Sequence, residues 1–451
     1  MQATTQSIGS YRWRICALLF FATTINYLDR QVLSLLKPTL EDEFGWSNQE
    51  YANIASVFQF TYALFLFLSG RFIDRIGTRA GYTWAIIIWS IGAMVHALAI
   101  PIGTILLPVA GLLGFTLVPL SVLGFMFSRF ILAVGEAGNF PAAIKATAEY
   151  FPPAERSLAT GIFNSGANVG AILAPLSVPW IAAQWGWQMA FLLIGAIGFI
   201  WVIFWWIWYR SPEQQKNLSA AELNYIRSGD TTVSDSTTPI SWSKLLLFRP
   251  TWAFILGKFL TDGVWWFYLF WLPAYLKDQY QLTGTAIMLP LTVLYSLTMI
   301  GSIVGGYLPS LVSNQKQSLY QSRIRVMGWI AAFPLVVLLA QPFGYISYWI
   351  PVLLIGVGAA AHQAWSANLF TTVSDNFPKA AVGSVVGVGG MAGGIGSVII
   401  TLTGGYLFDH YKLLGHIETG YTILFTFCAI AYLLAWVLIK ILVPIVRPLA
   451  V

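Results

Sequence analysis

The chain has 451 residues, of which 57% are hydrophobic and only 9% are charged, and its mean hydropathy is +0.71. Soluble domains carry roughly 25% charged residues, so this composition excludes a soluble globular protein and indicates an integral membrane protein with several spans. The formal net charge of +6 does not require a nucleic-acid partner, because the uneven distribution of Lys and Arg between connecting segments accounts for it.

Apolar stretches long enough for a membrane-spanning helix, about 20 residues, recur along the whole chain. We predict twelve such spans, at residues 15–36, 51–71, 81–101, 121–147, 157–182, 187–209, 251–276, 285–311, 324–341, 346–372, 381–407 and 418–443. The longest polar stretch divides them into six and six. The sequence therefore predicts an all-α integral membrane protein with two six-helix bundles, at 1–209 and 251–451, joined by a cytoplasmic linker at 210–250.

The first predicted span carries two adjacent charges, Asp29 and Arg30, about two-thirds of the way along its length. A charge at bilayer depth costs about 3 kcal/mol on insertion scales, so it normally faces a partner or a pathway. Adjacent residues point about 100° apart on a helix, so we expect these two to serve different partners. A structural salt bridge between them is the alternative.

The segment GRFIDRIGTR (70–79) follows the second span and resembles the Gly-x-x-x-Asp-Arg-x-Gly-x-Arg loop of the major facilitator superfamily. We expect Gly70 to let two helices approach closely. Asp74 can pair with Arg75 or Arg79, and such a pair would latch the two halves together on the cytoplasmic side. A charged loop that only sets the topology is the alternative reading.

The segment 100–120 is apolar but is broken by three prolines. A thirteenth span there would invert every later loop, which the charge distribution opposes. We therefore predict an extracytoplasmic excursion or a re-entrant segment.

The fourth predicted span places Arg129 and Glu136 seven residues apart, which puts them on one helical face about 10 Å apart along the axis, in the middle of an apolar run. An intrahelical polar network is the alternative to a functional pair. Lys145 and Lys258 lie near predicted inner helix ends, where a lysine either snorkels to the interface or joins a site.

An internal repeat relates the two halves of the chain. Residues 151–171 align without gaps on residues 377–397, an offset of 226. The Phe-Pro pair at the start of one segment coincides with that of the other, and glycines coincide at two further positions. The same offset maps Glu136 onto His362. Repeated halves with a substrate site between them at mid-membrane are typical of transporters, so we expect the two bundles to be pseudo-symmetric.

The basic residues predict the orientation of the spans, because cytoplasmic segments carry the positive excess. With the N-terminus inside, only three fall outside: Lys37, Lys277 and Lys412. The inner segments hold seventeen of the 24: Arg12, Arg14, Arg71, Arg75, Arg79, Arg156, Arg210, Lys216, Arg227, Lys244, Arg249, Lys316, Arg323, Arg325, Lys379, Lys440 and Arg447. Both termini are therefore predicted to be cytoplasmic.

Three segments resemble the anion:cation symporter family, and within it the bacterial hexuronate transporters most. They are NYLDR (26–30), SRFILAVGEAGNFPAAIKATAEYFPPAERSLATGIFNSG (128–166) and TDGVWWFYLFWLPAYL (261–276). The resemblance covers nearly the whole chain and departs from the family at the 100–120 insertion and at Lys258, where an arginine is usual.

The resemblance implies roles for several residues. It implies that Arg30 and Arg129 bind the substrate carboxylate and that Asp29 and Glu136 couple transport to protons. It also implies substrate contacts from two tyrosines, Tyr27 and Tyr62.

The chemistry supports the ionic roles, because a guanidinium stays protonated and binds a carboxylate through two parallel hydrogen bonds. Burial favours a neutral carboxyl group and a nearby cation favours its charged form, so substrate binding at an arginine would change the proton affinity of the acid.

Polar and aromatic residues of two further spans are candidates for the cavity wall. Asn164 lies on the fifth span. On the tenth span His362 and Trp365 share a helical face. For His362, a hydrogen-bonded histidine at a helix contact is the alternative to a substrate ligand.

We therefore expect a secondary transporter that imports a sugar-acid anion, first a hexuronate such as galacturonate or glucuronate, together with protons by alternating access. Another organic anion (an aldonate or aldarate) is the alternative substrate, and a membrane anion sensor is the alternative function. No motif of an intramembrane enzyme occurs, so we expect no enzyme and no catalytic residues. We expect no cofactor and no metal, since the H⁺ gradient drives transport. The expected location is the bacterial inner membrane, as a multi-pass monomer.

Overall fold

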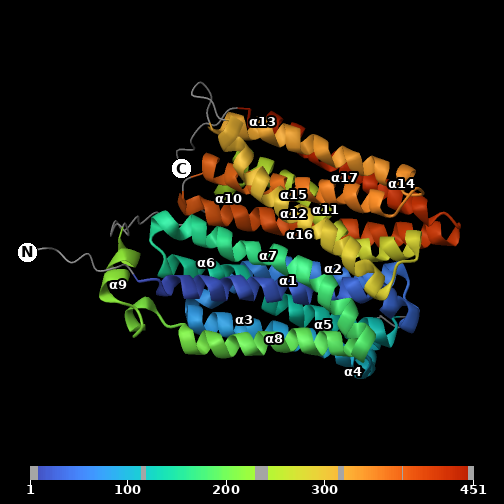
Figure 1. The fold of residues 1–451 in the computed structure, drawn as a ribbon, viewed down its shortest axis with the longest axis horizontal. Coiled ribbons are helices and arrows are strands. Elements are labelled where there is room, and N and C mark those ends of the chain that lie inside the picture. The colour runs from blue at the N-terminus through green and yellow to red at the C-terminus, as the bar shows by residue number, and fades with distance from the viewer. Residues whose placement is uncertain (1–8, 113–117, 229–241, 313–318, 378, 445–451) are drawn as a thin grey trace, which may run out of the picture. The chain divides into compact units, whose positions relative to one another are not determined.

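The computed structural model describes residues 9–112, 118–228, 242–312, 319–377 and 379–444, and this part of the chain is helical, without β-strands (Figure 1). Its first half contains α1 (Tyr11–Phe44), α2 (Asn48–Ile76), α3 (Thr78–Val95), α4 (Ala99–Leu112), α5 (Leu120–Glu136), α6 (Asn139–Tyr150), α7 (Pro153–Trp185), α8 (Trp187–Trp208) and α9 (Ala220–Arg227). Its second half contains α10 (Trp242–Leu245), α11 (Arg249–Tyr280), α12 (Met288–Val312), α13 (Leu319–Ala332), α14 (Ala340–Phe343), α15 (Trp349–Asn376), α16 (Lys379–Leu413) and α17 (Ile417–Leu442).

Each of the twelve predicted spans corresponds to one helix or to consecutive helices, with small differences at the ends. Nine helices or helical runs in the described part of the chain are long and apolar enough to cross a membrane. The three remaining spans, α1, α2 and α11, have lower apolarity, and α1 and α11 carry intramembrane charges such as Arg30 and Lys258. The prediction of an all-α membrane protein is confirmed.

The chain divides into two compact units. Unit 1 comprises Met1–Val32, Leu64–Ala174 and Gln188–Asp235, and unit 2 comprises Leu33–Ala63, Pro175–Trp187 and Ser236–Val451. The bundles at 1–209 and 251–451, with their linker at 210–250, stay a prediction from the sequence.

Close packing of α3 against α5 organises the centre of unit 1 (Figure 1). A Cβ on Gly135 would stand against the backbone of Trp89, so only a glycine lets the two helices approach this closely. The next residue along α5 is Glu136, and this packing holds the end of α5 in place.

The prediction that Glu136 lies in the middle of one continuous helix is wrong, because the span at 121–147 is two helices. Helix α5 ends at Glu136, and α6 begins at Asn139. Pro141 has no N–H to donate to the carbonyl of Ala137, which would be its partner in a continuous helix. The hydroxyl of Ser69 donates to that carbonyl instead, over 2.9 Å.

The loop after α2 explains one glycine of the 70–79 segment and contradicts the expectation for the other. Gly77 has a φ of +86°, a conformation that L side chains rarely adopt, and it separates α2 from α3. A Cβ on Gly70 would have no described atom within 4 Å. The expected close approach at Gly70 is therefore wrong, since this turn of α2 faces open space.

The 100–120 segment begins as a helix. A 3₁₀ turn, His96–Leu98, joins α3 directly to α4, and Gly103 and Gly124 bring α4 against the start of α5. Residues 99–112 thus lengthen the helical hairpin of α3 and α5, while residues 113–117 lie outside the described part. Whether the hairpin leaves the membrane stays a prediction.

The internal repeat has the same local structure in both halves. Phe151 follows α6 and Phe377 follows α15, and both are buried residues in an extended conformation. The backbone N–H of each donates to the carbonyl four residues before it. A long helix follows each of them, α7 in unit 1 and α16 in unit 2.

The glycine-rich start of α16 packs against α11 in unit 2. A Cβ on Gly396 would meet the backbone of Phe259, and one on Gly393 would meet the side chain of Asp262. The absence of a side chain at these two positions therefore lets α16 approach α11 closely.

Candidate functional site

The centre of unit 1 contains an ion pair between α1 and α5. The Nη2 and Nε atoms of Arg30 both donate to one oxygen of Glu136, Oε2, over 2.7 and 2.9 Å. Arg30 is 3% exposed and Glu136 is not exposed at all. An ion pair this deep in an apolar bundle is a candidate functional site by default.

Asp29 does not share the partner of Arg30, which confirms the prediction that these neighbours serve different partners. It is 2% exposed, and neither of its carboxyl oxygens has a hydrogen-bond partner among the residues that the structure describes. Arg129 approaches the same part of α1 from α5, where its two terminal nitrogens lie 3.4 Å from the carbonyl oxygen of Arg30. The structure thus brings Asp29, Arg30, Arg129 and Glu136 together in one buried group.

Two further residues of α1 surround Arg30. The ring centroid of Tyr27 lies 4.8 Å from the guanidinium carbon, and the side-chain oxygen of Asn26 accepts a bond of 3.3 Å from Nη2. Tyr27 is one of the predicted substrate contacts, whereas Asn26 was not predicted. Asn26 precedes Arg30 by four residues and so shares its helical face, which was the available signal in the sequence. Asn164 is an exposed residue of α7, and no contact with the Arg30 group is found in the described residues.

The three remaining residues predicted to contact substrate, Tyr62, His362 and Trp365, lie in unit 2. Tyr62 on α2 stacks on Phe58, and its ring centroid is 6.4 Å from that of Trp266 on α11. His362 on α15 stacks on Trp265, and its Nδ1 is 2.8 Å from the hydroxyl of Tyr432.

Trp365, also on α15, is fully buried and packs edge-on against Tyr432 of α17. Its burial indicates a packing role in this conformation. The assignment of Trp365 to a cavity wall stays a prediction.

The sequence analysis missed an ion pair on α11. The amine of Lys258 lies 2.7 Å from Oδ2 of Asp262, and the two side chains are 8% and 15% exposed. The sequence signal was an i, i+4 pair of opposite charges in an apolar helix. Asp262 lies in the segment TDGVWWFYLFWLPAYL (261–276), but the resemblance of that segment implied no role for it.

Two of the three predicted gating residues have described side chains. Arg79 donates to the backbone carbonyl of Trp206 on α8 over 2.6 Å and lies over its indole ring. Arg75 is exposed in the last turn of α2. The side chain of Asp74 lies outside the described part of the structure, so the predicted latch stays a prediction.

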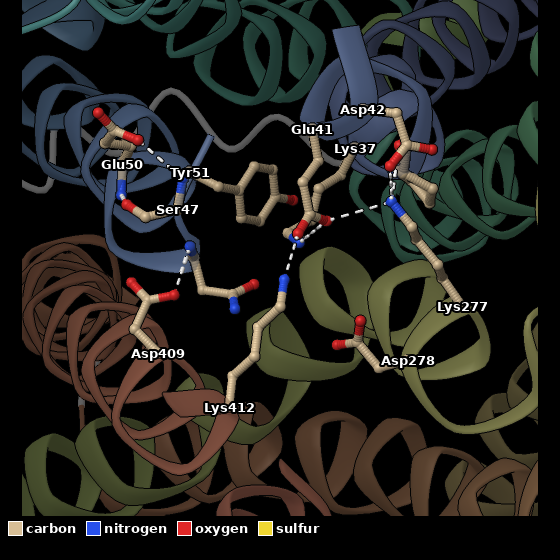
Figure 2. Close-up of polar contacts among 12 residues, drawn as sticks. Lys37, Glu41, Asp42, Ser47, Glu50, Tyr51, Lys277, Asp278, Asp409 and Lys412 are labelled. Atoms are coloured by element: carbon tan, nitrogen blue, oxygen red, sulfur yellow. Dashed lines mark hydrogen bonds and ion pairs between the residues drawn. The ribbon is translucent and has the colours of Figure 1, made fainter. Parts of the chain in front are cut away.

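An ionic cluster in unit 2 joins the end of α1 to α11 and α16, and Figure 2 shows three lysines converging on one carboxylate. Glu41 lies 3.0 Å from Lys37, 3.0 Å from Lys412 and 3.6 Å from Lys277. Lys277 also pairs with Asp42 over 2.5 Å. We call these five residues the Glu41 cluster.

The N-terminus of α2 is tied to α16 beside the Glu41 cluster. The carboxylate of Asp409 accepts the backbone N–H groups of Asn48 and Gln49, both over 2.8 Å (Figure 2). Within α2, Ser47 and Glu50 bond to each other's backbone N–H and form a capping box. Backbone donors at a helix start favour a carboxylate, so Asp409 stabilises this junction.

The lysines hold Glu41 in its charged form. Burial alone would raise the pKa of the Glu41 carboxyl, but the charge of Lys37, hydrogen bonds from Lys412 and Lys37, and the charge of Lys277 lower it from 4.5 to about 2. The same three lysines are the only basic residues that the charge distribution places outside. The predicted location of these three lysines on one side of the membrane is the feature of the sequence that could have indicated the cluster.

The helical fold, its long apolar helices and the buried ion pairs define a multi-pass membrane protein. The chain belongs to the Major Facilitator Superfamily, which it matches over residues 19–401. It is therefore a membrane transporter and not an enzyme.

Its relatives include two named sugar-acid carriers. The chain is 30% identical to the hexuronate transporter of Escherichia coli K12, over 90% of this chain and 89% of that one. It is 30% identical to the galacturonate transporter of Dickeya chrysanthemi, over 67% of this chain and 83% of that one.

Among solved structures, it resembles a bacterial homologue of the human lysosomal transporter Spinster in an inward-facing, unoccupied conformation, with a TM-score of 0.72 and 17% identity over 96% and 98% of the two chains.

Proposed function

We propose that the protein imports a sugar-acid anion together with protons across a bacterial inner membrane. Among the sugar acids, a hexuronate is the substrate that we propose. The single observation that carries this proposal is the buried Arg30–Glu136 pair, in which two donors of one guanidinium hold one carboxylate oxygen. The names of the 30% identical relatives support a hexuronate as the substrate. The protein acts as a monomer with both termini in the cytoplasm.

Competition between two carboxylates explains the coupling. In the empty carrier Arg30 neutralises Glu136. A substrate carboxylate that takes the bidentate face of Arg30 displaces Glu136, and an unpaired carboxylate at this depth is far less costly when protonated. Substrate therefore binds with a proton on Glu136. Arg129, beside the backbone of Arg30, holds the same carboxylate from α5, and Asp29 is the second acid available to carry a proton.

Alternating access also requires a closure on each side of the membrane. We assign the outer closure to the Glu41 cluster, because it joins the end of α1 to two helices from the other half of the sequence. The inner closure remains the one that the 70–79 segment predicts, with Asp74, Arg75 and Arg79.

The substitution Glu136→Gln tests the coupling, because glutamine imitates a permanently protonated acid. In liposomes the variant should bind substrate and exchange labelled for unlabelled substrate, since exchange needs no proton release. It should lose accumulation driven by a pH gradient. Full pH-driven accumulation would move the coupling to Asp29 or His362, and loss of exchange as well would make Glu136 a structural or binding residue.

Aldonates and aldarates share the carboxylate and hydroxyl groups of hexuronates, so they are the alternative substrates. A thermal-shift screen of the purified protein against a panel of sugar acids separates them, because a ligand of the folded state raises the melting temperature. Counterflow of labelled substrate separates a transporter from a sensor that binds without transport.

A further inference from the structure

A cavity of about 440 Å³ lies between α13 and α17 in unit 2, and none of the described residues that line it is assigned to transport. Its wall contains two cations, Arg325 and Lys440, and two tryptophans, Trp329 and Trp436. None of the described residues that line it is acidic. The cavity therefore combines positive charge with aromatic surface.

The packing of α17 on α13 shapes the cavity. The indole N–H of Trp436 donates to the backbone carbonyl of Ile324 over 2.9 Å. Gly328 makes room for this indole, because a Cβ there would stand 2.9 Å from the Trp436 ring. The amine of Lys440 lies 4.9 Å from the centroid of the same ring, which keeps this cation at the cavity.

The two cations are available to a ligand. Both side chains are exposed, and no carboxylate in the described part of the chain lies within ion-pair distance of either.

Exposed apolar side chains lead away from the cavity along both helices. Trp329 on α13 and Phe333, the first residue of the 3₁₀ helix Phe333–Leu339 that follows it directly, come after Arg325 at steps of four residues and are 52% and 55% exposed. On α17 the stripe consists of Ile430, Leu434, Val437 and Ile441. In a membrane protein such a stripe faces acyl chains. Cations and tryptophans at its end then lie at the level of the lipid headgroups.

We propose that this cavity binds the phosphate headgroup of an anionic phospholipid, with the phosphate between Arg325 and Lys440 and the acyl chains along the apolar stripe. Basic pockets between membrane helices on the cytoplasmic side suit such headgroups. The predicted orientation places this end of α13 and α17 in the cytoplasmic leaflet. A free phosphate ion shares the charge chemistry but would leave the stripe without a function.

Native mass spectrometry of the detergent-purified full chain tests the site. With added phosphatidylglycerol the wild type should retain one lipid molecule that added phosphatidylcholine does not replace. The double variant R325Q/K440Q should bind that lipid about thirty-fold more weakly, as expected for the loss of two charges near the headgroup. The charge-keeping variant R325K/K440R should retain it.

A matched control removes the same charge elsewhere. Lys244 and Arg249 are exposed, lie on the same predicted side and do not line the cavity. The variant K244Q/R249Q should keep wild-type lipid binding. Equal losses in both double variants, or equal retention of the two lipids by the wild type, would overturn the site. Displacement of the lipid by millimolar inorganic phosphate would show a free-anion site instead. Unchanged melting temperatures without lipid would exclude misfolding as the cause.

Discussion

Arg129 and Arg30 offer a geometry that a lysine cannot reproduce. A guanidinium holds a carboxylate through two parallel bonds, whereas an ammonium acts as a point charge. We expect Arg129→Lys to reduce uptake at low substrate concentration by at least ten-fold although the charge is kept, and Arg30→Lys to behave similarly.

Initial uptake rates in liposomes measure this effect. Arg14→Lys is the matched control, since Arg14 is an exposed residue of α1 away from the buried group. Wild-type uptake by Arg129→Lys at low substrate concentration would speak against a direct carboxylate ligand.

Variants of the Lys258–Asp262 pair can show whether the pair has a structural role or a functional one. Asp262→Asn leaves a buried lysine without its carboxylate, and breaking a buried pair costs about 3–5 kcal/mol. The variant should therefore melt well below the wild type.

Replacement of both partners by apolar residues, as in Lys258→Met with Asp262→Leu, should restore the melting temperature. We expect that double variant to remain defective in uptake, because charges at this depth are normally kept for function. Recovery of both properties would make the pair purely structural.

At the scale of elements, the Glu41 cluster should stabilise the junction of α1 with α11 and α16. Lys37 is only 1% exposed, so Glu41→Gln leaves a buried cation without its acid and should cost about 3–5 kcal/mol. Asp42→Asn is the control on the same helix. Asp42 is 68% exposed at its side chain, and exposed ion pairs contribute at most about 1 kcal/mol.

Thermal melting of the purified variants measures the difference. Glu41→Gln should lower the melting temperature markedly, and Asp42→Asn should change it little. Similar melting of the two variants would contradict a central role for Glu41.

The pKa of Glu41 also fixes the pH range of this stabilisation. The pKa is lower in the folded protein, at about 2, than the ordinary value of 4.5. A carboxyl group lowered in this way stabilises the fold fully above its unfolded pKa, and its contribution is lost as the pH falls through the folded value. The groups that face the Glu41 carboxylate are Lys37, Lys277 and Lys412.

The melting difference between wild type and Glu41→Gln should therefore be constant from pH 8 to about pH 5 and shrink at lower pH. A difference that shrinks between pH 8 and 6 would assign the effect to another group, with Asp278 the nearest other acid on α11.

The sequence predicted the positions of the helices better than the breaks within them. Apolar length located all twelve spans, and the repeated Phe-Pro pair located the same helix junction in both halves. The break after Glu136 was missed, because an apolar run through residues 121–147 outweighed one proline. Pro141 has no N–H for the carbonyl of Ala137, which instead accepts a hydrogen bond from the Ser69 hydroxyl of α2. Ion pairs between distant helices, such as Arg30–Glu136 and Lys412–Glu41, require a tertiary structure, so the sequence could name their members but not their partners.

At the scale of the whole molecule, the distribution of Lys and Arg bears on the two proposed closures as well as on the predicted orientation of the spans. Seventeen inner cations against three outer ones set the predicted topology. All three lysines that are predicted to lie outside converge on Glu41, so we propose that they act together in one closure. On the inner side, where cations are abundant, Arg79 binds a backbone carbonyl of α8 and Arg75 remains exposed. We therefore expect the inner closure to depend on Asp74, the acid of the 70–79 segment.

Neutralising Asp74 tests that dependence at the scale of the transport cycle. Asp74 lies near the end of α2, one turn before Gly77 and far along the helix from the residues assigned to substrate. If it stabilises the state that is closed on the inner side, Asp74→Asn should slow turnover by ten-fold or more, because that state is visited in every cycle. Substrate affinity should stay within a few-fold of the wild type. Maximal uptake rate and thermal-shift affinity, measured on the same preparation, separate the two quantities. A large loss of affinity with normal turnover would instead place Asp74 at the binding site.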